Sequence, residues 1–253
     1  MKKSKKRRLL PVILLVVLIG AVCGGIWAVH SRNAARSESA FSLTISGVSI
    51  SEEEYLQCMK SVRYDTKMEL KGQKPDVTED TVWTETYEDG QTGYEILTEC
   101  TVEQLKYIHA VYDIAKEKGY IQDATFEGMK QRMEQENAQR SEKVTRGEAV
   151  YGLKEYILDL YQEYELSMIE EKYILDETNE GMGLTEEEIE AYYNTRDWIV
   201  GEDARKADLS EARAAVIDEM RRNRYQELTE QKAEVAEADG DMDQLSQFTL
   251  KQL

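Results

Sequence analysis

The sequence predicts a mainly helical protein that begins with a transmembrane helix and carries a small β-element near the two ends of its outer part. An uncharged apolar run of 21 residues, 9–29, follows six basic residues. Helical spacing and helix-capping signals recur along residues 51–235. Alternation with a period of two, which is typical of strands, occurs only around residues 41–50 and at the C-terminal end.

The N-terminal segment is interpreted as an uncleaved membrane anchor. A helix needs about 20 apolar residues to cross a bilayer, and residues 9–29 meet that length. Residues 1–8 carry six positive charges, so they are expected to stay in the cytoplasm with the rest of the chain outside it. Cys23 leaves open a lipoprotein alternative. The usual lipidation signal has leucine and a small residue where this chain has Gly20 and Val22.

Acidic residues dominate the remainder of the chain. Eight of the 32 basic residues lie in the first 36 residues, which hold no acid, so 24 basic residues face 50 acidic ones beyond them, a formal charge of −26. Phosphate groups repel such a surface, because basic contacts supply most nucleic-acid affinity. The composition therefore excludes a nucleic-acid-binding protein and favours basic partners.

Residues 30–40 are small and polar and are interpreted as a linker to the outer part, residues 41–253. Its opening stretch predicts a β-hairpin followed directly by a helix. Residues 41–45 alternate apolar and polar side chains, and a Ser-Gly pair offers a tight turn before a short return strand. Ser51 is expected to cap the first helix, with Glu54 as its reciprocal partner three residues later.

Apolar spacing and helix-ending residues define the next helices. The first is expected to run to about Leu70, where Gly72 and Pro75 stop it. Asp123 is expected to begin a highly charged helix that ends near Arg146. The helix between them is marked by apolar residues at helical spacing and by a terminal glycine: Leu97, Val102, Leu105, Ile108, Val111, Tyr112, Ala115 and Gly119.

The clearest apolar stripe of the chain comes next. Its members fall at steps of three and four residues: Leu153, Tyr156, Ile157, Leu160, Tyr161, Tyr164 and Met168. Thr185 with Glu188 predicts a short capped helix, and residues 208–235 predict a long one. His30 and His109 are isolated, so His109 is interpreted as a packed or boundary residue rather than as a base or ligand.

The order of four segments resembles the SurA/PrsA/trigger-factor-like foldases. "ISGVSISEEEYLQ" resembles the opening of that family, with Ser46-Gly47 in place of the usual Asn-Gly. "LKYIHAVYDIAKEKGYI" resembles the helix that follows, and "LTEEEIEAYYNTR" resembles the segment before the parvulin isomerase domain. The last helix and tail resemble the family's returning helix and strand.

The resemblance implies a SurA-like helical peptide-binding domain over residues 41–253. Its first strand would pair with its last, in residues 233–238 or in 245–250, and the helices between would form a cradle. One departure matters: only "DWIVGEDARKA" stands where a parvulin domain of about 90 residues would lie. The resemblance therefore implies a chaperone without peptidyl-prolyl isomerase catalysis.

Side chains suited to adaptable apolar contact gather in the second half of the chain. Tyrosine offers contact area with a polar tip, and methionine packs flexibly. The candidate client-binding residues share these properties: Tyr156, Tyr161, Tyr164, Met168, Tyr192 and Tyr193. Ordinary core packing is the alternative interpretation. No phosphate-binding loop, metal-ligand cluster or catalytic triad is found, so no catalytic residue and no cofactor is expected.

Three functional hypotheses follow. The first is a membrane-anchored extracytoplasmic chaperone, a holdase that binds unfolded exported polypeptides. The second is a structural or adaptor subunit that binds one dedicated partner of the cell envelope or of secretion. The third and least favoured is a residual isomerase. The sequence leaves open the client, the oligomeric state and whether Cys58 pairs with Cys100.

Overall fold

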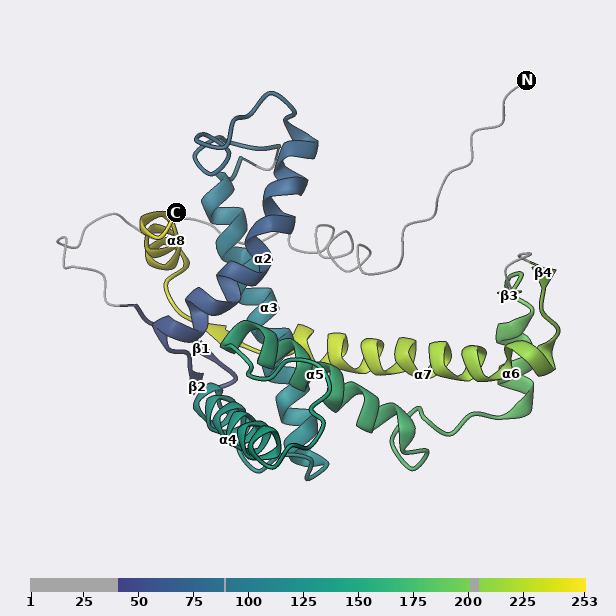
Figure 1. Ribbon diagram of the computed structural model, residues 1–253. Helices are drawn as coiled ribbons and strands as arrows, with labels where there is room; N and C mark the ends of the chain where they lie inside the picture. Colours follow the sequence, from purple (N-terminus) through teal and green to yellow (C-terminus); the bar gives the residue numbers. More distant parts are fainter. Residues whose placement is uncertain (1–40, 89, 201–204) are drawn as a thin grey trace, which may run out of the picture. The chain divides into compact units, whose positions relative to one another are not determined.

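The computed structural model describes residues 41–88, 90–200 and 205–253 as a mainly helical fold with two small β-sheets (Figure 1). The mainly helical class and the small β-element near the two ends of the outer part are confirmed.

The predicted cytoplasmic segment 1–8, anchor 9–29 and linker 30–40 lie outside the described residues, as does Cys23. Within the described part, none of the helices combines the length and the apolar character that a bilayer span requires. The membrane anchor therefore stays a prediction.

The first sheet joins the two ends of the described chain. Strand β1 (Thr44–Ile45) lies between β2 (Val48–Ser49) and β5 (Ala238–Asp239) and pairs antiparallel with both. Ser46 and Gly47 form the turn between β1 and β2 with φ of 48° and 79°. A two-residue turn with positive φ suits the right-handed twist of the flanking strands. Glycine adopts positive φ without strain, which explains its place in the turn. The predicted hairpin is confirmed. The expected pairing with a strand over residues 233–238 is right only at its end, because the paired strand is Ala238–Asp239 and residues up to Glu234 are helical.

The last segment is helical, so the alternative strand in residues 245–250 is wrong. Helix α8 (Met242–Lys251) begins where the Asp241 carboxylate accepts hydrogen bonds from the backbone N–H groups of Asp243 and Gln244, both at 3.1 Å. Leu245 and Thr249, one turn apart, are both buried. Apolar residues alternating over so short a segment fit a strand as well as a helix. The N-cap at Asp241 favours the helix.

Thr249 ties α8 to the body of the fold. Its hydroxyl hydrogen-bonds Tyr55 Oη and accepts a bond from Thr98 Oγ1 at 2.9 Å, and all three groups are buried. We expect Thr249→Val to lower the free energy of unfolding by about 1–2 kcal/mol, because Tyr55 loses its partner away from water. Urea titration measures this, and Thr145→Val, which removes an exposed hydroxyl from another helix, should change stability by less than about 0.5 kcal/mol.

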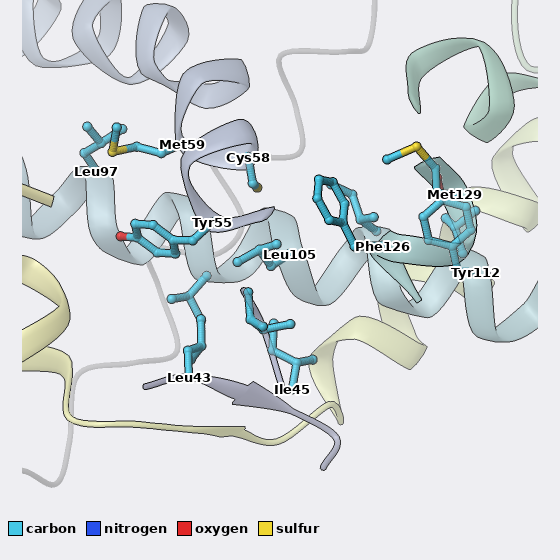
Figure 2. Packing of buried hydrophobic residues seen from close by; sticks show 14 of the residues in the cluster. Leu43, Ile45, Tyr55, Cys58, Met59, Leu97, Leu105, Tyr112, Phe126 and Met129 are labelled. Atoms are coloured by element: carbon cyan, nitrogen blue, oxygen red, sulfur yellow. The ribbon is translucent and has the colours of Figure 1, made fainter. Parts of the chain in front are cut away.

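Two long helices, α2 (Glu52–Gln73) and α3 (Gly93–Glu117), pack along each other and carry most of the main hydrophobic core. Figure 2 shows Leu43, which directly precedes β1, and Ile45 of β1 beside Tyr55 and Leu105 of these helices. Apolar residues of the hairpin thus close one side of the core.

Helix α3 ends at a glycine, and one of the two described cysteines lies in this core. Gly119 follows α3 with φ of 70°, the left-handed conformation that its predicted role as a helix-ending glycine requires. Cys58 is buried, Cys100 is half-buried, and both are free thiols. Burial raises the pKa of the Cys58 thiol, with the Glu54 carboxylate adding to the effect.

Helix α4 (Phe126–Thr145) begins three residues later than expected. Asp123 does not start the helix, because its carboxylate accepts a hydrogen bond from the Thr125 N–H at 2.9 Å. Thr125 is the actual cap, accepting a bond from the Gly128 N–H at 3.1 Å. A loop then leads to α5 (Leu158–Leu175).

The long helix that precedes β5 contributes side chains to two hydrophobic clusters. Helix α7 (Leu209–Glu234) is capped by Asp208, as expected, and contacts α3, α5 and the short α6 (Glu186–Tyr193). Its first half contributes Val216 and Met220 to a cluster with Ile189 and Trp198. Between α6 and α7 lies a two-stranded hairpin, β3 (Ile199–Val200) with β4 (Arg205–Lys206) (Figure 1).

Candidate binding surface

Three of the predicted tyrosines form one aromatic group. Tyr156 stacks on Tyr164 with ring centroids 4.9 Å apart, and Tyr161 lies 5.7 Å from Tyr156 and 6.0 Å from Tyr164. Tyr156 and Tyr161 are buried in the main core, whereas Tyr164 is half-buried. Burial and the nearby Glu165 carboxylate raise the pKa of Tyr161. The group therefore has a packed inner side and one partly exposed ring.

Two side chains of α4 fix the loop before α5. The Asn137 side chain bonds both backbone groups of Tyr156, as a neighbouring β-strand does. Its amide donates to the Tyr156 carbonyl at 2.9 Å, and its oxygen accepts from the Tyr156 N–H at 2.7 Å. Arg140, itself buried, donates to the carbonyls of Tyr151 and Leu153 at 3.0 and 2.7 Å. Its guanidinium lies 4.6 Å from the centre of the Tyr156 ring. The loop is thus held by polar bonds, and α5 cannot begin before Ile157.

A buried ion pair fastens α5 to α4. Arg132 donates two parallel bonds to the Glu165 carboxylate, at 2.6 and 2.9 Å, and Tyr161 Oη donates to the same carboxylate at 3.2 Å. Arg132 also donates to the Asp123 carbonyl at 2.6 Å. Glu165 is only 7% exposed, so its charge is stable there only with these partners.

Helix α5 is apolar on two faces. One face packs inward through Tyr161, Ile169 and Tyr173. The other carries apolar side chains at steps that repeat with the helical turn, of which all but the half-buried Tyr164 are exposed: Ile157, Leu160, Tyr164, Met168 and Leu175. We call these five residues the α5 stripe. The stripe extends over about 27 Å at 1.5 Å per residue.

The exposure of the stripe is unusual for apolar side chains. Ile157 is 61% exposed, Leu160 40%, Met168 43% and Leu175 67%. Tyr151 and Leu153, in the loop that Arg140 holds, are exposed as well. Single exposed apolar residues need no explanation, but a helix-long row of them is typical of an interaction surface.

The expected seven-residue stripe is therefore only partly right. Tyr156 and Tyr161 point into the core, while Leu153, Ile157, Leu160 and Met168 are exposed. Leu175 was not among the predicted residues, although it continues the same helix face seven residues after Met168. The apolar spacing indicated the exposed face. It did not show that α5 also has an inward face, on which the polar residues Gln162 and Glu165 are buried among apolar ones.

Tyr192 and Tyr193 belong to a different cluster. Tyr192 Oη donates to the Glu219 carboxylate at 2.8 Å, and Tyr193 Oη donates to the Ala207 carbonyl at 2.8 Å. Both rings pack against the cluster around Trp198. The structure thus groups Tyr161, Tyr164 and Met168 on α5 with Tyr156 in the loop before it, and separates them from this pair. A client-binding role for any of the six stays a prediction.

The described residues offer no group of three or more His, Cys, Asp or Glu side chains that could hold a metal ion. The buried His109 Nε2 lies 2.9 Å from Glu54 Oε1 and joins α3 to α2. This contact agrees with the expectation that His109 is a packed residue. The chemistry that the α5 stripe can perform is apolar contact.

Comparisons with known proteins show similarity to a chaperone. A chaperone for lacto-N-biosidase from Bifidobacterium longum subsp. longum is 34% identical over 166 residues, which cover 65% of this chain and 59% of that protein. No family model matches the chain, and no solved structure matches it. The chain is therefore similar to a chaperone, while the SurA/PrsA-like assignment stays a prediction.

Proposed function

We propose that this chain is a chaperone that holds one dedicated polypeptide partner. The observation that carries the proposal is the similarity to a protein named as chaperone for a single enzyme. A protein named as chaperone for one enzyme resembles an adaptor with one dedicated partner more than it resembles a general holdase. By extension, the client here would be one enzyme polypeptide during or after its export.

The structure supports a binding role through the α5 stripe. A chaperone needs apolar surface that is accessible before the client arrives and held in place by the rest of the fold. The stripe meets both conditions, because Arg132 and Arg140 of α4 fix α5 and the loop before it. The α5 stripe is therefore the surface on which we place the client.

The finer parts of the proposal are SurA/PrsA-like architecture and membrane anchoring through residues 9–29. The pairing of β1 with β5 supports the first, since that family closes its domain by joining early and late strands. Anchoring would hold the domain outside the cytoplasmic membrane, where exported clients emerge. Among the residues that the structure describes, the β3–β4 hairpin alone stands where the parvulin domain would lie, which supports a chaperone without isomerase catalysis.

Crosslinking in the native host tests the proposal. We expect one protein to dominate the partners captured with the full-length chain, and its active form to become scarce when the gene is deleted. Restoring the gene with Leu160→Asp and Met168→Asp should not restore that enzyme. A variant changed at the similarly exposed Met68 of α2, Met68→Asp, should restore it. A broad smear of captured proteins would instead favour the general holdase.

A further inference from the structure

Acidic side chains without ion partners line the α5 stripe. Glu163 and Glu171 of α5 and Glu155 of the preceding loop are exposed, and none forms an ion pair with any residue that the structure describes. By contrast, Glu165 and Glu170 of the same helix pair with Arg132 and Arg222. The free acids therefore follow the stripe and not the packed face.

Helix geometry places these acids beside the apolar row. At 100° per residue, Glu171 lies on the outer face between Met168 and Leu175, and Glu163 lies on the flank next to Leu160. A partner that covers the stripe therefore comes close to both carboxylates. Positive charge on that partner lowers the free energy of the complex, whereas negative charge raises it.

A second copy of this chain does not fit the stripe. If two α5 helices packed antiparallel about a two-fold axis at the middle of the stripe, Glu163 of one copy would lie within about one turn of Glu171 of the other. Like charges would then face each other at both ends of the contact. The net charge of −26 beyond the first 36 residues adds to this repulsion.

An extended chain does not fit the stripe either. Every backbone group in the middle of α5 is bonded within the helix, so the surface offers nothing to pair with the backbone of an extended segment. A helix brings its own backbone bonds and needs only apolar side chains at matching steps.

We propose that the α5 stripe binds a helical segment of the client that is amphipathic and basic. The segment has apolar side chains at i, i+3 or i+4 and i+7, with lysine or arginine beside them. The stripe's length corresponds to about 18 residues of such a helix. This inference rests on the proposed function, because the helix is taken to be part of the client.

Synthetic helices of 18 residues probe this surface directly. One peptide carries a leucine stripe flanked by lysine, the second replaces each lysine with glutamate, and the third is the lysine peptide with a central proline. Each is labelled with fluorescein and titrated with the full-length chain while anisotropy is recorded. We expect the lysine peptide to bind at least tenfold more tightly than either of the others, and salt to reduce the difference between the lysine and glutamate peptides.

Variants of the chain assign the binding to the stripe. Leu160→Asp with Met168→Asp should weaken binding of the lysine peptide at least tenfold, whereas Met68→Asp should leave it unchanged. Glu163→Gln with Glu171→Gln should reduce the preference for lysine over glutamate several-fold. Equal binding of the lysine and glutamate peptides, or an unchanged affinity for the proline peptide, would overturn the inference.

The two proposals can fail separately. If one client is captured by crosslinking but the peptides bind without regard to charge, the helix inference is wrong and the proposed function stands. If no dominant client is captured, the proposed function is wrong, whatever the peptides do.

Discussion

Replacing His109 with alanine is expected to lower the free energy of unfolding by about 3–5 kcal/mol. His109 of α3 and Glu54 of α2 lie 2.9 Å apart, and each is less than a tenth exposed. The substitution leaves the Glu54 carboxylate buried without its partner and opens space beside it. Urea titration followed by far-ultraviolet circular dichroism measures the loss.

A double substitution separates the buried pair from general packing. Glu54→Leu with His109→Leu removes both polar groups and should recover much of the lost stability, because no unpaired group is left. Lys232→Ala breaks an exposed ion pair with Glu117 and should cost less than about 1 kcal/mol. If His109→Ala costs no more than Lys232→Ala, the buried contact does not stabilise the fold.

Replacing Arg132 with alanine is expected to cost about 3–4 kcal/mol and to loosen α4 from α5. The guanidinium is the cation that neutralises the buried Glu165, and it also bonds the carbonyl before α4. Hydrogen exchange should increase along both helices, and binding to the α5 stripe should weaken because the stripe loses its support.

An exposed ion pair that also involves α5 provides the matched control. Lys60 of α2 pairs with Asp159 of α5, but the Lys60 side chain is 69% exposed, so Lys60→Ala should cost less than about 1 kcal/mol. If hydrogen exchange in α5 is no faster in the Arg132→Ala protein than in the Lys60→Ala protein, Arg132 does not hold α5 against α4.

Features set by neighbours in the chain could be predicted from the sequence. The turn at Ser46-Gly47 follows from the positive φ that glycine adopts without strain. The start of α7 follows from the Asp208 carboxylate, which accepts a hydrogen bond from the Glu211 N–H three residues later. At Thr185 the reciprocal bond with Glu188 is formed as expected, with the Thr185 N–H donating to Glu188 at 2.8 Å.

Features set by distant residues could not be predicted. Glu54 was expected to bond back to the N–H of Ser51, but its carboxylate turns inward to His109, 55 residues away. Likewise, the apolar spacing before Leu158 looks helical, yet Asn137 and Arg140 occupy the backbone groups that a helix would use. The site follows the same rule: the row of apolar side chains is visible in the sequence, but its exposed side depends on Arg132.

The position of β1 in its sheet has a consequence for biosynthesis. The middle strand leaves the ribosome well before its neighbour β5 and before helix α8, which covers Tyr55. A growing chain therefore keeps one edge of that strand unpaired and part of the core uncovered until β5 and α8 have emerged. Nascent chains arrested before residue 238 should be cut readily by protease, and chains in which α8 has left the ribosome should resist it.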